Sequence, residues 1–180
     1  IGTRGEAYRY REWYGSDGTP NKGLRLSPRE VAEGIVALEA RAETMDNIFI
    51  NRVADPAIFD RSRGDSVAQM MEPTPGGKQG VYFKPGDNTR MAGKMQLHER
   101  LRFGDDGRPM LQVFSTCKDT LRTLPNLPYS KTKPEDVDSD AEDHVYDETR
   151  YFLMHRPLPL RGMTKSEPAA YDPFRRYEKE

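Results

Sequence analysis

The sequence contains a single cysteine, Cys117, among its 180 residues. A disulfide within the chain and a zinc site built from cysteines are therefore excluded, and a reducing compartment fits this composition. No apolar run approaches the roughly 20 residues that cross a membrane, and no signal-peptide pattern stands at Ile1. We therefore expect neither membrane insertion nor a disulfide-stabilised fold.

A phosphate-binding loop is also missing. The loop 73–80 contains glycines, but no Gly-Lys-Ser/Thr sequence follows them. The chain has no initiating Met and opens in strand-like sequence, so we expect it to be part of a longer protein.

The chain has almost no net charge, because its basic and acidic residues nearly balance to a formal charge of −1. This balance argues against bulk attraction to nucleic acid. The charges are nevertheless segregated: residues 84–133 hold ten Lys and Arg against five Asp and Glu, whereas residues 135–148 hold eight acidic residues and no Lys or Arg. A basic surface beside an acidic pocket suits a metal-dependent enzyme that acts on a phosphodiester. Chance segregation along the chain is the alternative interpretation.

The acidic stretch Glu135–Tyr151 (EDVDSDAEDHVYDETRY) is the most unusual part of the chain, and its second half predicts a helix that packs one edge against a core. His144, Asp147 and Tyr151 fall on one helical face, because positions three and four apart are neighbours. A His and an Asp in acidic surroundings suit a hard divalent cation. The alternative is a solvated acidic linker that leads into a helix with an ordinary His.

Hydrophobic periodicity predicts strands and helices that alternate along the chain. The predicted strands are residues 7–14, 48–54, 81–83 and 110–114; the predicted helices are residues 27–43, 65–71, 89–103, 116–124 and the second half of 135–151. This order predicts a three-layer α/β domain with a mixed or parallel sheet. The expected helix caps are Ser27 with Glu30, Asp65 or Ser66, and Thr116 with Asp119.

Asp55 follows the predicted buried strand that ends at Ala54. The carboxyl end of a strand is where open α/β sheets place their ligands. Asp55 is therefore a candidate site residue, with the alternative that it caps the turn at Pro56.

The predicted helix 89–103 has a basic face that could contact phosphates. The candidates for DNA contact are Arg90, Lys94, Arg100 and, on the next helix, Lys118. A solvated face is the alternative. Beyond residues 1–155, the segment 156–180 is polar and rich in proline, and we expect it to form a mobile or surface-bound tail.

Six segments taken together resemble the C-terminal nuclease domain of a tailed-phage terminase large subunit, the viral DNA-packaging motor. In chain order they are YREWY, ADPAIFD, SVAQMM, RMAGKMQLHERL, PMLQVFSTCKDTLRTLPNL and DAEDHVYDETRY, and the resemblance covers roughly residues 7–154. The resemblance implies a ribonuclease H-like fold, an α/β mixed sheet flanked by helices.

The resemblance also implies an active site. The second catalytic carboxylate of the family falls on Asp55, and its terminal H-x-x-D element falls on His144 and Asp147. Together these residues would bind two divalent ions, Mg²⁺ or Mn²⁺, with Asp143 and Glu142 as second choices. The first catalytic Asp of the family lies on an upstream strand that this chain does not contain. We therefore expect a sheet that lacks its first strand or strands, and weak or absent cleavage by this chain alone.

The implied function is a metal-dependent endonuclease that cuts concatemeric double-stranded DNA by two-metal hydrolysis. The family further implies a terminase small subunit, a portal protein and an ATPase domain of the same parent chain as partners, in the host cytoplasm. Two alternatives stay open: another ribonuclease H-like nuclease such as a resolvase or integrase, and a non-catalytic module that docks on DNA or portal protein. The tail from Arg156 onward would dock on the portal or the ATPase, or be a disordered end.

Overall fold

The computed structural model describes residues 2, 5–40, 50–77 and 79–159. Its elements alternate in the predicted order. The strands are β1 (Ala7–Arg9), β2 (Val53–Ala54), β3 (Lys84–Pro85) and β4 (Leu111–Val113); the helices are α1 (Pro28–Ala40), α2 (Val67–Met71), α3 (Arg90–Leu101), α4 (Lys118–Thr123) and α5 (His144–His155); the 3₁₀ turns are η1 (Pro56–Phe59) and η2 (Leu124–Asn126). The first residues of the predicted strand 48–54, the predicted end of the first helix and the tail from residue 160 lie outside the described residues.

The strands form two separate parallel pairs, β1 with β4 and β2 with β3. The α/β class is therefore confirmed, but the single sheet that we predicted is not found among the described residues. The β1–β4 ladder is short because the chain turns into α4 directly after it. There, the Thr116 hydroxyl donates to the Tyr10 carbonyl (2.8 Å) and the Cys117 thiol donates to the Arg9 carbonyl (3.3 Å).

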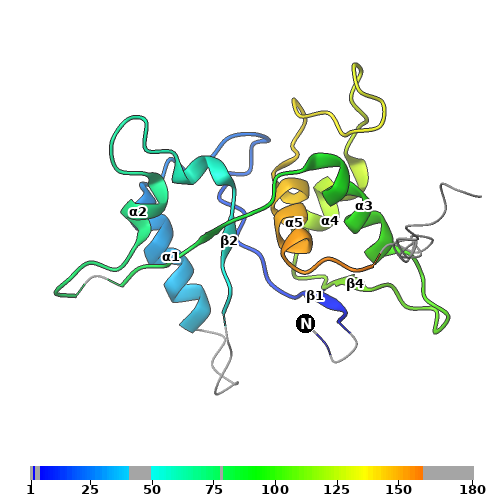
Figure 1. Cartoon of the computed structure of the whole chain (residues 1–180), viewed down its shortest axis with the longest axis horizontal. Helices are drawn as coiled ribbons and strands as arrows, with labels where there is room; N and C mark the ends of the chain where they lie inside the picture. The colour runs from blue at the N-terminus through cyan, green and yellow to red at the C-terminus, as the bar shows by residue number, and fades with distance from the viewer. Residues whose placement is uncertain (1, 3–4, 41–49, 78, 160–180) are drawn as a thin grey trace, which may run out of the picture.

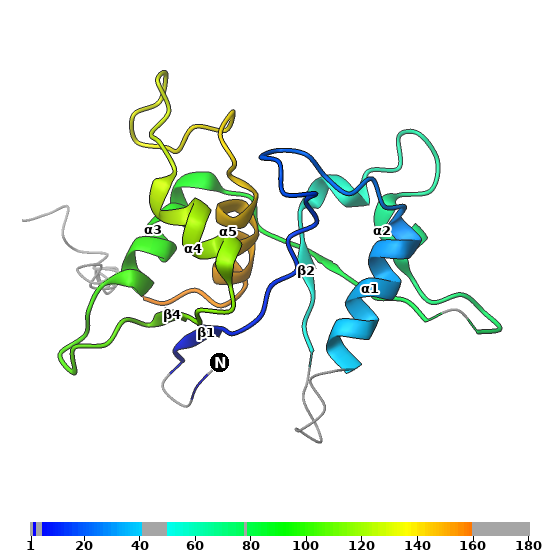
Figure 2. The same ribbon diagram turned by 180° about the vertical axis from the view of Figure 1, so that it is seen from behind.

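The helices gather on two sides of the molecule. Figure 1 shows α1 and α2 on one side of β2, and α3, α4 and α5 with the β1–β4 pair on the other; the reverse view in Figure 2 shows the same division. Each side has its own small core. Ala32, Met71 and Val81 form the core beside α1 and α2.

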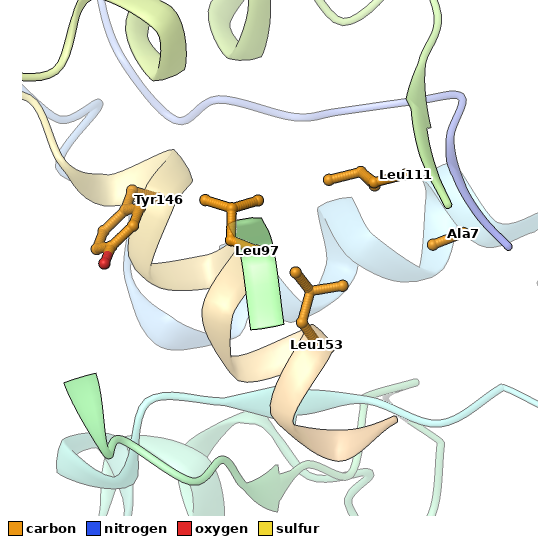
Figure 3. Packing of buried hydrophobic residues seen from close by; sticks show 5 residues of the cluster. All are labelled: Ala7, Leu97, Leu111, Tyr146 and Leu153. Atoms are coloured by element: carbon orange, nitrogen blue, oxygen red, sulfur yellow. The ribbon is translucent and has the colours of Figure 1, made fainter. Parts of the chain in front are cut away.

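The larger core lies between α3 and α5. Figure 3 shows Leu97 of α3 facing Tyr146 and Leu153 of α5, with Ala7 and Leu111 from the β1–β4 pair closing the cluster. Leu153 is completely buried. This packing fixes the position of α5, the helix that carries most of the predicted site.

Two of the three predicted helix starts are confirmed. At α1, the Ser27 N–H donates to the Glu30 carboxylate (2.7 Å) and the Glu30 N–H donates to the Ser27 hydroxyl (3.3 Å), which is a capping box. Ser66 forms the same arrangement with Gln69 at the start of α2. The prediction at Thr116 is wrong.

At the start of α4, the N-cap residue is Cys117, without a side-chain capping bond. Glu12 supplies the acceptors from far along the chain: its carboxylate accepts from the N–H groups of Asp119 (2.6 Å) and Thr120 (3.1 Å). The Thr116 hydroxyl is not free for this role because it bonds to Tyr10.

A cavity of about 750 Å³ lies beside the continuation of β1. Residues 10–14, Ile35 and Leu38 of α1, and Val145 and Phe152 of α5 line it. Within the described residues, no helix is long and apolar enough to cross a bilayer.

Candidate functional site

Asp55 joins the end of β2 to α5. One carboxylate oxygen, Oδ1, accepts from the Ala57 N–H (2.7 Å) and so caps η1. The other, Oδ2, accepts from the Tyr151 hydroxyl of α5 (2.8 Å). The capping interpretation of Asp55 is therefore correct, and the same carboxylate also faces the helix that carries Asp147.

Asp147 lies one helical turn before Tyr151 and is held by arginines. Its Oδ1 accepts from Arg150 Nε (3.1 Å) and Nη2 (2.6 Å), and Arg90 Nη1 lies 3.7 Å away. The Asp147 side chain is 25% exposed, whereas the Arg150 side chain is 1% exposed. One oxygen of Asp147 is thus fixed by a buried cation while part of the carboxylate still reaches solvent.

The Tyr151 hydroxyl lies in the field of both carboxylates. Burial, the hydrogen bond to Asp55 and the negative charges of Asp147 and Asp55 together raise the pKa of Tyr151 to about 12. The hydroxyl therefore stays protonated at neutral pH and remains a hydrogen-bond donor. Tyr151 thus links the Asp55 carboxylate to α5, one helical turn from Asp147.

Asp143 crowds the same end of α5. It is the N-cap residue of α5, is buried and makes no side-chain capping bond. Burial is the largest cause that raises the pKa of Asp143, and the charge of Asp147 adds to it. Asp143 is thus a second, partly desolvated carboxyl group close to Asp147 at the start of α5.

His144 lies at the start of α5 beside Tyr14, with ring centroids 6.5 Å apart, and lines the cavity. Among the described residues, no hydrogen bond joins its ring to Asp147 or Asp55. Glu142, a second-choice ligand, is engaged elsewhere: its carboxylate accepts from Arg122 (2.7 and 2.8 Å) and from Tyr14 (2.7 Å). The bonds from Arg122 are the largest cause that lowers the pKa of Glu142 to about 2.

Asp87 is a candidate that sequence reasoning missed. Since β2 and β3 run in parallel with Ala54 opposite Pro85, Asp55 and Asp87 follow the same ends of neighbouring strands. Asp87 is exposed and accepts from the Thr89 N–H (2.9 Å) and hydroxyl (2.6 Å). We expected the strand at 81–83, which left Asp87 in a loop; no local sequence signal marks it, and only the observed pairing of β3 with β2 places it at the same end as Asp55.

The donor set fits a hard cation in its chemistry, since Asp55, Asp87 and Asp147 offer carboxylate oxygens. Within the described residues, no three His, Cys, Asp or Glu side chains converge closely enough to hold a metal ion. Each carboxylate instead has a local donor: Ala57 and Tyr151 for Asp55, Thr89 for Asp87, and Arg150 for Asp147. A cation would have to compete with these donors or share the carboxylates with them.

Three of the four predicted DNA-binding residues have partners within the protein, and two of them, Lys94 and Arg100, are buried. Arg90 pairs with Asp136 (2.6 Å). Lys94 is buried, donates to the Glu135 carbonyl and lies 4.8 Å from the centroid of the Tyr129 ring. These contacts attach the loop before α5 to α3.

Arg100 is also buried, and its guanidinium donates to the carbonyls of Gly5 (3.0 Å) and Arg156. Arg90, Lys94 and Arg100 are therefore bound within the fold, and a phosphate would have to compete with these contacts. Lys118, at the start of α4, is exposed.

Comparison with family models, with curated proteins and with solved structures gave no match. The likeness to terminase nuclease domains therefore rests on the sequence motifs, and the function has to be argued from the site.

Proposed function

We propose that this chain is a divalent-metal-dependent DNA endonuclease domain of a viral packaging terminase, with a ribonuclease H-like sheet. The observation that carries the proposal is the hydrogen bond from Tyr151 to Asp55. It joins a strand-end carboxylate to the helix turn that presents Asp147, as an oxygen-ligand site shared by separate elements requires. The terminase resemblance of the sequence points to the same residues.

The proposed ligands are Asp55 and Asp147, with Asp87 at the end of β3 and Asp143 at the start of α5. Two bound ions, Mg²⁺ or Mn²⁺, would supply an activated water and stabilise the leaving oxygen of a cleaved phosphodiester. The chain's own residues orient the carboxylates: Arg150 holds Oδ1 of Asp147, and Tyr151 holds Oδ2 of Asp55. His144 lies near Asp143 and would contribute a ligand or orient the site.

Contact with double-stranded DNA would be independent of sequence, through exposed cations that reach phosphates. Lys118 stays a candidate, and Arg61 and Arg63 join it, because both are exposed on the loop that follows η1. The small subunit, the portal protein, the ATPase domain of the parent chain and the host cytoplasm belong to the same proposal through the resemblance.

The test uses two aspartates at opposite ends of one turn. Asp55 is the N-cap of η1 and contacts Tyr151, whereas Asp60 is its C-cap, is exposed and bonds to Ser62. Supercoiled plasmid is incubated with Mn²⁺ and wild-type, Asp55→Asn or Asp60→Asn protein. We expect weak nicking that disappears in Asp55→Asn and persists in Asp60→Asn. Equal nicking by both variants would contradict the assignment.

A docking module without catalysis is the second candidate. It is favoured by one observation, that each candidate carboxylate is already bound by a donor of the protein. Salt-sensitive DNA binding without nicking, in a chain that also binds no Mn²⁺, would support the module over the nuclease.

A further inference from the structure

Two neighbouring residues of α5 each hold one candidate carboxylate. Tyr151 donates its hydroxyl to Oδ2 of Asp55 (2.8 Å), and Arg150 donates two N–H groups to Oδ1 of Asp147 (3.1 and 2.6 Å). Both side chains are buried. Their rotamers are therefore restricted by packing, which is what a supporting residue needs in order to fix the direction of a ligand.

Two glycines make this packing possible. A Cβ atom at Gly86, just after β3, would lie 2.9 Å from Cβ of Tyr151 and 3.1 Å from its ring. A Cβ atom at Gly93 of α3 would lie 3.0–3.1 Å from the Arg150 side chain. The backbone therefore approaches Tyr151 and Arg150 as closely as a glycine allows, and the Tyr151 ring is held at one place beside the ends of β2 and β3.

We propose that Tyr151 is a positioning residue that fixes the direction of the Asp55 carboxylate for a divalent cation. This inference rests on the proposed function. Hydrogen bonds to the ligands of a metal commonly contribute 10–100-fold to its affinity, because they fix the direction of the ligand. Tyr151 acts through Asp55, so its effect requires the Asp55 carboxylate to be present.

The chain offers a matched control on the same helix. Tyr146 is also a buried tyrosine of α5, and its ring lies 5.3 Å from the Arg150 guanidinium, as the Tyr151 ring does. Its hydroxyl has no hydrogen-bond partner among the described residues. Tyr146→Phe and Tyr151→Phe therefore remove the same atom from the same helix, but only the second removes a bond to a candidate ligand.

The experiment measures Mn²⁺ binding by isothermal titration calorimetry, with free Mn²⁺ followed by electron paramagnetic resonance. We expect Tyr151→Phe to weaken binding about tenfold or more and Tyr146→Phe to leave it unchanged. In the Asp55→Asn background, Tyr151→Phe should weaken binding no further. Thermal melts without metal show that each variant is folded.

The outcomes separate the two proposals. If wild type binds Mn²⁺ and Asp55→Asn weakens binding while Tyr151→Phe does not, the role of Tyr151 is wrong and the proposed function stands. If Tyr151→Phe weakens binding equally with and without the Asp55 carboxylate, its effect is structural and the inference is overturned. If wild type does not bind Mn²⁺, both proposals fail.

Discussion

Removing the Asp147 carboxylate should destabilise the protein strongly, quite apart from any effect on cleavage. Asp147 pairs with Arg150, whose side chain is only 1% exposed. Asp147→Ala leaves this guanidinium buried without its carboxylate. Loss of one partner from a buried ion pair typically costs about 3–5 kcal/mol. For a chain of this length each kcal/mol lowers the melting temperature by roughly 2–4 °C.

Arg150→Met should cost less, since the Asp147 carboxylate that remains is 25% exposed and can be hydrated. The double variant Asp147→Ala, Arg150→Met contains no buried charge at this position. We expect it to be more stable than Asp147→Ala alone, and a double-mutant cycle in urea should give a coupling of about 2 kcal/mol or more.

Glu148 is the matched control. It lies next to Asp147 on α5 and also pairs with an arginine, Arg9 (2.6 Å), but its side chain is 61% exposed. Exposed ion pairs contribute about 0–1 kcal/mol, so Glu148→Ala should cost no more than that. If Asp147→Ala lowers the free energy of unfolding no more than Glu148→Ala does, the buried-pair argument is refuted.

Two further predictions concern stability. Burial and the charge of Asp147 raise the pKa of Asp143, so its carboxyl group binds a proton more tightly in the folded protein than in the unfolded chain. The free energy of unfolding that depends on Asp143 therefore falls as the pH rises above about 4. Asp143→Asn should therefore melt higher than wild type at pH 7 but not below pH 4; an equal difference at both pH values would contradict this. A Cβ atom at Gly34 of α1 would lie 2.3 Å from the Trp13 ring, so Gly34→Ala should lose about 1–3 kcal/mol through overpacking against a helix-propensity gain of about 1 kcal/mol. In urea unfolding, Gly34→Ala should raise the free energy of unfolding only in the Trp13→Ala background, where the ring is absent. A higher free energy of unfolding for Gly34→Ala alone would contradict the overpacking.

The sequence predicted the order of elements because their local signals are strong. The capping box at Ser27 and the apolar spacing of α3 and α5 depend on residues a few positions apart, which periodicity can detect. How strands pair depends on distant residues instead. No local pattern predicts that β1–β4 and β2–β3 form separate pairs. None predicts that Asp87 lies at the same end as Asp55 either.

The basic residues of α3 were correctly grouped by their helical spacing, but in the structure they bind groups of the same protein. Helical spacing identified Arg90, Lys94 and Arg100 as one charged set, but spacing does not distinguish solvent from the loops of the same protein. The loop before α5 supplies Asp136 to Arg90, and the Glu135 carbonyl to Lys94. The long side chains of these cations thus bind carbonyl and carboxylate groups of loops that the small core does not bury.

The capping residue of α4 shows the same limit. Thr116 has the right residue type and spacing for a cap, yet Glu12 provides the acceptors across more than a hundred residues. Asp55 was predicted either as a ligand residue at a strand end or as a turn cap; the capping bond is present, and the ligand role stays a prediction.

Diffraction from crystals soaked in Mn²⁺, with the anomalous signal of manganese, would test the central proposal most directly. We expect an anomalous peak within bonding distance of carboxylate oxygens from both Asp55 and Asp147. A fully soaked crystal with manganese bound only elsewhere, and with both carboxylates still held by Tyr151 and Arg150 alone, would contradict it.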